Sequence, residues 1–484
     1  MDRRSTRAAV ALAATAWLAI GCTSGPAPTA AKAPERKPNF LLIVADDLGY
    51  SDLGAYGGEI ATPNLDRLAR SGATMTQFYA SPFCSPTRAM LMSGTDNHQA
   101  GFGDMAELML PEQRGKPGYE GFLNQRVFAL PEVLKSAGYR TVMAGKWHLG
   151  VAEEQSPAAR GFDRSYAMVQ GGASHFGDQA GIVAVDPTKP PKAIYRENGK
   201  AVDTPRQGFF SSEAFASRVI QYLDETKGDG SKPFFAYLAF TAPHWPLHAP
   251  DADIARYENR YDAGYDALRG ERLERMKKLD LVPAATTAYR GHPHWPTWER
   301  LPAEQKRSEA RRMAVYAAMV DHMDRQIGRV LKHLESSGEL DNTVVVFISD
   351  NGADGNSVYD VARTREWIHK DMDNSTANLG RPGSFIEYGP GWAQVGSTPL
   401  NLYKSFMYEG GISVPAIFWS PRQGIAAQQR TQVGHVMDIA PTIYEMAGAR
   451  HPGTSHQGRA LLPVKGRSLV AYLQGKQASA YGPN

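Results

Sequence analysis

Residues 39–47 read Asn-Phe-Leu-Leu-Ile-Val-Ala-Asp-Asp, and this stretch decides the fold. After Asn39 the run is apolar up to Ala45, with no alternation between polar and apolar positions. A run of this kind is typical of a parallel strand covered by helices on both faces. We therefore predict a central parallel strand over 39–45, with Asp46 and Asp47 at its carboxyl end.

The same pattern continues along the rest of the chain. Apolar runs bounded by turn residues alternate with helical segments that carry start and stop signals. This alternation indicates an α/β fold with a central, mostly parallel sheet flanked by helices. The expected elements are a helix that begins at Thr62-Pro63 and stops at Gly72, a helix at 130–137 followed by a turn and a strand over 138–144, and strands at 233–240 and 342–349.

The clearest helix is predicted over 303–336. Its apolar residues recur in steps of three and four and form one buried face, typical of core rather than of a cofactor site. They are Met313, Tyr316, Val320, Met323, Ile327, Val330 and Leu334. Residues 252–300 and 353–400 are rich in polar and aromatic residues, and we expect them to be long surface insertions.

The composition is that of a folded globular protein. The chain has 484 residues, 42% hydrophobic and 21% charged, which suits one large α/β domain over 39–484. The net charge of +3 comes without a basic stripe, so nucleic acid is not an indicated partner.

The first 22 residues have the form of an export signal. Arg3, Arg4 and Arg7 precede a short apolar core, and Gly21-Cys22 follows it. We expect cleavage before Cys22 and a lipid anchor on that residue, which would place the protein in the periplasm as a lipoprotein. The alternative is an ordinary secretory signal with an incidental cysteine. Residues 23–38 are rich in Ala, Pro, Thr and Lys and are expected to be a flexible tether.

Cys84-Ser85-Pro86-Thr87-Arg88 is the stretch most suggestive of chemistry. Pro86 suits the first turn of a helix, which would place Cys84 just before the helix N-terminus, where anions are favoured. Arg88 would lie one turn later on the same face and could bind an anionic oxygen. A nucleophile beside an anion site suits attack on a sulfate or phosphate ester. The alternative is a buried structural cysteine.

Polar residues follow the two predicted central strands. Asp46-Asp47 ends one and Asp350-Asn351 ends the other, and ligand sites in open α/β sheets lie beyond these strand ends. Three carboxylates and an amide are oxygen donors that suit a hard divalent cation, Ca²⁺ or Mg²⁺. Each pair alone could equally be a turn or a helix cap.

Three further segments carry candidate residues. Lys146 and His148 follow a strand and are two apart, so they would point the same way in an extended segment. His244 lies between two prolines after another strand, and Lys404 precedes a glycine pair. Taken singly, these side chains could be a loop histidine or a solvated surface lysine.

Together these motifs resemble those of the sulfatase family, from about residue 38 to about residue 475, and most closely the bacterial arylsulfatases. The resemblance implies an alkaline-phosphatase-like fold with a mixed sheet. It implies metal ligands at Asp46, Asp47, Asp350 and Asn351, with Ca²⁺ favoured over Mg²⁺, and a formylglycine made from Cys84 that also touches the metal. It implies sulfate contacts from Arg88, Lys146, His148, His244 and Lys404.

The resemblance also implies partners and a function. Cys84 would be converted by a formylglycine-generating enzyme, and the substrate would be a small sulfate ester, most simply an aryl sulfate. Relatives carry a small C-terminal α+β subdomain for which we find no counterpart before Asn484. Two alternatives stay open: a phosphonate or phosphate monoester hydrolase, and an inactive lipoprotein that only binds sulfate esters. We expect a monomer.

Overall fold

The computed structural model describes residues 36–178, 180–182, 191–203, 207–225, 232–357, 359 and 362–482. Residues 37–484 form one compact unit. The predicted signal segment, its Cys22 and most of the predicted tether lie outside the described residues. Among the helices in the described ranges, none is both long enough and apolar enough to cross a membrane.

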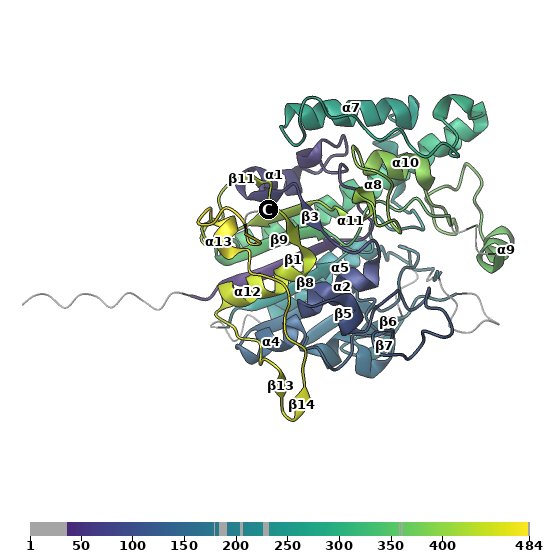
Figure 1. Ribbon diagram of the computed structural model, residues 1–484. Helices are drawn as coiled ribbons and strands as arrows, with labels where there is room; N and C mark the ends of the chain where they lie inside the picture. Colours follow the sequence, from purple (N-terminus) through teal and green to yellow (C-terminus); the bar gives the residue numbers. More distant parts are fainter. Residues whose placement is uncertain are drawn as a thin grey trace, which may run out of the picture. The chain divides into compact units, whose positions relative to one another are not determined.

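A ten-stranded sheet organises this unit (Figure 1), with the order β11-β2-β10-β9-β1-β8-β4-β5-β6-β7. The strands are β1 Asn39–Ala45, β2 Ala73–Met75, β4 Arg140–Lys146, β5 Arg164–Met168, β6 Tyr195–Glu197, β7 Lys200–Val202, β8 Phe234–Ala239, β9 Thr343–Ser349, β10 Ala416–Trp419 and β11 Gln428–Arg430. Four short strands form two further sheets of two strands each. One pairs β3 Phe78–Tyr79 with β12 Gly434–His435, and the other pairs β13 Ser455–His456 with β14 Arg459–Ala460.

Strand β1 lies in the middle of this sheet, as predicted. It pairs in parallel with β8 and with β9, so that Val44 lies opposite both Ala239 and Ile348. Strands β4 and β5 continue the parallel part, whereas β10 and β6 run antiparallel to their neighbours. The predicted α/β class with a mostly parallel, mixed sheet is confirmed.

Helices cover both faces of the sheet. They are α1 Pro63–Ser71, α2 Cys84–Ser93, α3 Asn97–Ala100, α4 Leu130–Ser136, α5 Ser211–Glu225, α6 Asp251–Ala255, α7 Gly264–Lys278, α8 Ala303–Ser336, α9 Ala362–Asp371, α10 Gly389–Gly396, α11 Glu409–Ile412, α12 Ile439–Ala447 and α13 Val470–Leu473.

Alternate residues of β1 point into two separate hydrophobic cores. Leu41 and Ile43 pack in the core that contains α1, α5 and α8, while Leu42 and Val44 pack in the core of α2, α4 and α12. This explains why the strand is apolar on both faces.

Helix α8 coincides with the prediction over 303–336, and all seven residues of its apolar face are buried. The predicted surface insertions are more integrated than expected. Within 252–300, Tyr261 and Met276 belong to the core, and Arg272 of α7 is buried against Glu59, with Nε 2.8 Å from Oε2. Within 353–400, Trp392 of α10 is also fully buried.

Candidate active site

The site lies where four adjacent strands end. In the order β9-β1-β8-β4, the carboxyl ends of these parallel strands meet at one edge of the sheet. Asp46 and Asp47 follow β1, Asp350 and Asn351 follow β9, His244 lies in the loop after β8, and Lys146 is the last residue of β4. All of these side chains are buried.

Close strand contact positions Lys146. At the preceding Gly145, φ is 125°, and a Cβ there would lie 1.7 Å from the backbone oxygen of Ala239 in β8. Only glycine fits this approach. The Lys146 ammonium then reaches Asp46, with Nζ 2.7 and 2.8 Å from the two carboxylate oxygens.

Helix α2 carries Cys84, the residue predicted to be the nucleophile. Cys84 is its first residue, with Phe83 as the N-cap, rather than lying just before the helix as predicted. Cys84 is buried, and its Sγ is 3.7 Å from Oδ1 of Asp47. Burial raises the pKa of the Cys84 thiol well above its usual range, so an unmodified Cys84 would be a poor thiolate nucleophile.

Arg88 lies one turn into α2 and is fully buried. Its Nε and Nη2 donate to Oδ2 of Asp350 at 2.9 and 2.7 Å, and its Nη1 donates to the backbone oxygen of Lys146 at 3.0 Å. The guanidinium therefore ties the helix to the ends of β9 and β4. Burial alone would raise the pKa of Asp350, but Arg88 and the two lysines outweigh it and hold that pKa well below its usual range.

Four groups could hold a cation. Ligand atoms of Asp46, Asp47, Cys84 and His244 all lie within 4.8 Å of one another. Asn351 donates from Nδ2 to Oδ1 of Asp47 at 2.6 Å, while its buried Oδ1 has no hydrogen-bond partner among the described residues. A buried oxygen without a partner beside the carboxylate of Asp47 fits a hard divalent cation.

Lys404 completes the positive side of the site. Its Nζ is 2.9 Å from Oδ2 of Asp47 and 2.9 Å from Oδ2 of Asp354. Burial alone would lower the pKa of Lys404, but Asp354 and Asp47 reverse this and raise it well above its usual range. Lys404 therefore stays charged at neutral pH.

The two histidines predicted to contact sulfate, His148 and His244, are buried and neutral at pH 7. Burial, then the charges of Lys404 and Lys146, lower the pKa of His244 well below its usual range. Its Nε2 is 3.4 Å from Oδ2 of Asp47. Burial also lowers the pKa of His148, whose Nε2 is 3.3 Å from both carboxylate oxygens of Glu107.

The described contacts join nine of the ten sequence-predicted residues into one network. These are Asp46, Asp47, Cys84, Arg88, Lys146, His244, Asp350, Asn351 and Lys404. The tenth, His148, lies two residues beyond Lys146 and contacts Glu107 instead.

Sequence reasoning missed Asp354 and Glu107. Asp354 lies four residues after Asp350, close enough in the chain to have been considered with it. Glu107 belongs to a segment whose function no local pattern revealed.

A family model described as Sulfatase matches residues 38–449. The chain is a member of the sulfatase family. This sulfatase is therefore a sulfuric ester hydrolase with the fold that the family motifs predicted.

Two curated relatives support this assignment. An uncharacterized sulfatase of Schizosaccharomyces pombe is 46% identical over 452 residues, which cover 91% of this chain and 80% of that protein. An arylsulfatase of Klebsiella aerogenes is 40% identical over 453 residues, which cover 92% of this chain and 94% of the relative.

A solved structure is similar as well. The crystal structure of Ps i-CgsB in complex with k-i-k-neocarrahexaose has 27% sequence identity and a TM-score of 0.59, and the match covers 86% of this sulfatase and 73% of that chain.

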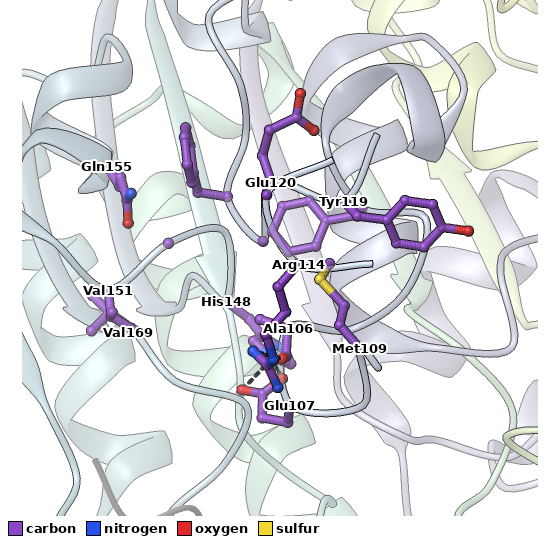
Figure 2. Close-up of a pocket in the computed structure, with 15 residues that line it drawn as sticks. Ala106, Glu107, Met109, Arg114, Tyr119, Glu120, His148, Val151, Gln155 and Val169 are labelled. Atoms are coloured by element: carbon purple, nitrogen blue, oxygen red, sulfur yellow. Dashed lines mark hydrogen bonds and ion pairs between the residues drawn. The ribbon is translucent and has the colours of Figure 1, made fainter. Parts of the chain in front are cut away.

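A cavity of about 310 Å³ lies beside His148 (Figure 2). Glu107 and His148 face each other in its wall, and Arg114 and Glu120 add charge. The apolar part of the wall includes Phe102, Met109, Tyr119, Phe122, Val151 and Val169.

Proposed function

We propose that this sulfatase hydrolyses aryl sulfates to a phenol and sulfate, through a formylglycine made from Cys84 and a bound divalent cation, Ca²⁺ rather than Mg²⁺. The observation that carries the proposal is the position of Cys84. It begins a buried helix and lies next to Asp47, inside a network that also holds three cationic side chains. The identity to an arylsulfatase supports the aryl preference.

Two groups would complete the site. A cation held by Asp46, Asp47, Asp350 and Asn351, the ligands that the sulfatase motifs imply, would polarise a sulfate oxygen and lower the pKa of a bound hydroxyl. Two of these ligands, Asp46 and Asp47, belong to the cluster that also contains Cys84 and His244. Formylglycine at position 84 would supply, as its hydrate, the hydroxyl that attacks sulfur.

The protein's own cations would stabilise charge on the sulfate oxygens. Lys146 and Lys404 are held by carboxylates at the strand ends, so they need little reorganisation during the reaction. Arg88 has its donors engaged by Asp350 and the Lys146 backbone, so its part is to orient Asp350 and add positive potential.

The histidines would handle protons. Neutral His148 would accept the proton of the second hydroxyl at position 84, and His244 or Lys404 would stabilise the departing phenol oxygen. The low pKa of His148 keeps it in the base form near neutral pH.

The test is hydrolysis of 4-nitrophenyl sulfate by protein made in a host that generates formylglycine, compared with Cys84→Ala. We expect turnover that the variant loses, and peptide mass spectrometry should find residue 84 converted only in the unmutated protein. Faster hydrolysis of a phosphonate monoester would favour the phosphonate hydrolase. Binding without hydrolysis by converted protein would favour the inactive binder.

We further propose that the protein is exported, anchored through Cys22 and monomeric. The basis for export and for the anchor is the Arg-rich start, the apolar core and the Gly21-Cys22 pair. Cys22→Ser should release the protein from the membrane fraction, and persistence there would overturn the anchor.

A further inference from the structure

Glu107 lies against His148 but belongs to none of the motifs that define the site. It follows α3, in the segment between α3 and α4. Both of its carboxylate oxygens are 3.3 Å from Nε2 of His148, and Figure 2 shows the two side chains facing each other. The Glu107 side chain is 25% exposed, whereas that of His148 is 6% exposed. Both residues line the cavity, and the carboxylate is the more exposed of the two groups.

The contact with Glu107 determines which nitrogen of the His148 ring carries the proton. A carboxylate only accepts hydrogen bonds, so Nε2 must carry the proton in the neutral ring. Nδ1 is then the basic nitrogen, and it is buried without a hydrogen-bond partner among the described residues. Second partners of this kind commonly set the tautomer of a functional histidine.

The charges around the ring act in opposite directions. Glu107 favours the protonated ring, while Lys146 and Arg88 disfavour it. Those two cations are themselves paired with Asp46 and Asp350. Burial would raise the pKa of Glu107, but His148 lowers it to about 2, so the carboxylate stays ionised and does not itself take the proton.

We propose that Glu107 is a positioning residue for His148: it holds the tautomer with the proton on Nε2, leaves Nδ1 as the base, and stabilises the imidazolium formed during turnover. This inference rests on the proposed function. In the step concerned, the second hydroxyl at position 84 would give its proton to Nδ1, so that its O–H bond breaks and an N–H bond forms. The electron pair of that O–H bond would form the C=O bond of the aldehyde, and the C–O bond to the sulfate group would break so that sulfate leaves. Glu107 would balance the positive charge of the ring. The arrangement parallels the carboxylate of a hydrolase triad, which orients a histidine without becoming protonated.

The cavity makes the proposal testable by chemical rescue. Glu107→Ala would leave a space that is open to the cavity of about 310 Å³, large enough for formate or acetate. Glu107→Gln would keep the shape but remove the charge. Glu112→Gln is the matched control, because Glu112 is an exposed acid in the same segment.

We expect kcat for 4-nitrophenyl sulfate to fall about 10²-fold in Glu107→Gln and Glu107→Ala, with KM falling in parallel because His148 acts after the phenol has left. Formate should restore part of the rate to Glu107→Ala but not to Glu107→Gln. The acidic limb of the kcat profile should move to lower pH in both, since His148 loses the charge that favours its protonation. Glu112→Gln should behave like the unmutated protein.

Unchanged kcat in Glu107→Gln would overturn the proposal. A second set of results would also overturn it: Glu107→Ala loses activity that formate does not restore, its pH profile is unchanged, and its melting temperature is lowered. These results would show that Glu107 has only a structural role. The unmutated protein and Cys84→Ala report separately on the proposed function. If the unmutated protein is inactive, nitrogen NMR of labelled histidine decides: His148 should carry its proton on Nε2 and lose that preference in Glu107→Ala, which removes the acceptor, and any other tautomer in the unmutated protein contradicts the proposal.

Discussion

Asp47 is the residue at which most contacts of the site converge. Its carboxylate accepts hydrogen bonds from Asn351 Nδ2 and Lys404 Nζ. It also lies near Cys84 Sγ and His244 Nε2. Its backbone is left-handed, with φ of 66°, which is uncommon for a residue other than glycine. Backbone strain of this kind persists where the surrounding structure fixes the residue, and it often marks functional sites.

Lys404→Ala should lower kcat/KM for an aryl sulfate about 10²- to 10³-fold, the usual effect of removing one preorganised charge-stabilising group. It should also destabilise the fold, because Asp47 and Asp354 lose their shared cation. Steady-state kinetics and thermal melting measure the two effects. Lys465→Ala, which removes an exposed lysine, is the control, and equal activity in both variants would contradict the assignment.

The residues at the strand ends were predictable because strand order and polarity place them at one edge of the sheet. Asp350 and Asn351 were found in this way. Glu107 was not, since the segment that carries it has neither a strong apolar period nor a motif, and only the three-dimensional contact with His148 reveals it.

At the scale of elements, helix α1 begins where the sequence predicts, but a different residue caps it. Thr62 precedes the helix as expected, but its side chain does not cap it. Asp324 of α8 does so instead, accepting from the backbone N–H groups of Asn64 and Leu65 at 3.1 and 2.9 Å. A partner 260 residues away in sequence cannot be identified from a local pattern.

Burial raises the pKa of Asp324 to about 6. A raised pKa in the folded state gives stability that is complete below the unfolded value near 3.8 and is lost as the pH rises through about 6. Asp324→Asn cannot titrate and has one acceptor oxygen fewer, so it should be destabilised. That destabilisation should shrink by about 2 kcal/mol between pH 4 and pH 7. Denaturant unfolding at both pH values measures it, and a pH-independent difference would refute the assignment.

Elements with long apolar periods were predicted well. Strand β1 and helix α8 match their predicted bounds because each buries a continuous pattern of its own. Helix α7 was not predicted, because its apolar residues are few and its stability depends on Arg272 reaching Asp52 and Glu59.

At the scale of the whole unit, the site joins the ends of the central strands, so ligand binding there should stabilise the fold. Removing divalent cations with EDTA is expected to abolish activity and lower the melting temperature. A ligand bound only by the folded state at 100 times its Kd contributes about 2.7 kcal/mol. Ca²⁺ should restore both properties better than Mg²⁺. An Asp47→Ala variant should show no such shift, and full activity in EDTA would disprove the cation requirement.

The buried charges of the site can be added up. Asp46, Asp47, Asp350 and Asp354 face Arg88, Lys146 and Lys404, which leaves one surplus negative charge when all are ionised. A divalent cation converts the surplus to one positive charge, and the single negative charge of a sulfate monoester cancels it. A phosphate monoester dianion would leave an uncompensated buried charge, which is costly. Discrimination between sulfur and phosphorus esters would then depend on the charge of the substrate more than on its shape, and singly charged phosphonate monoesters would satisfy the same electroneutrality.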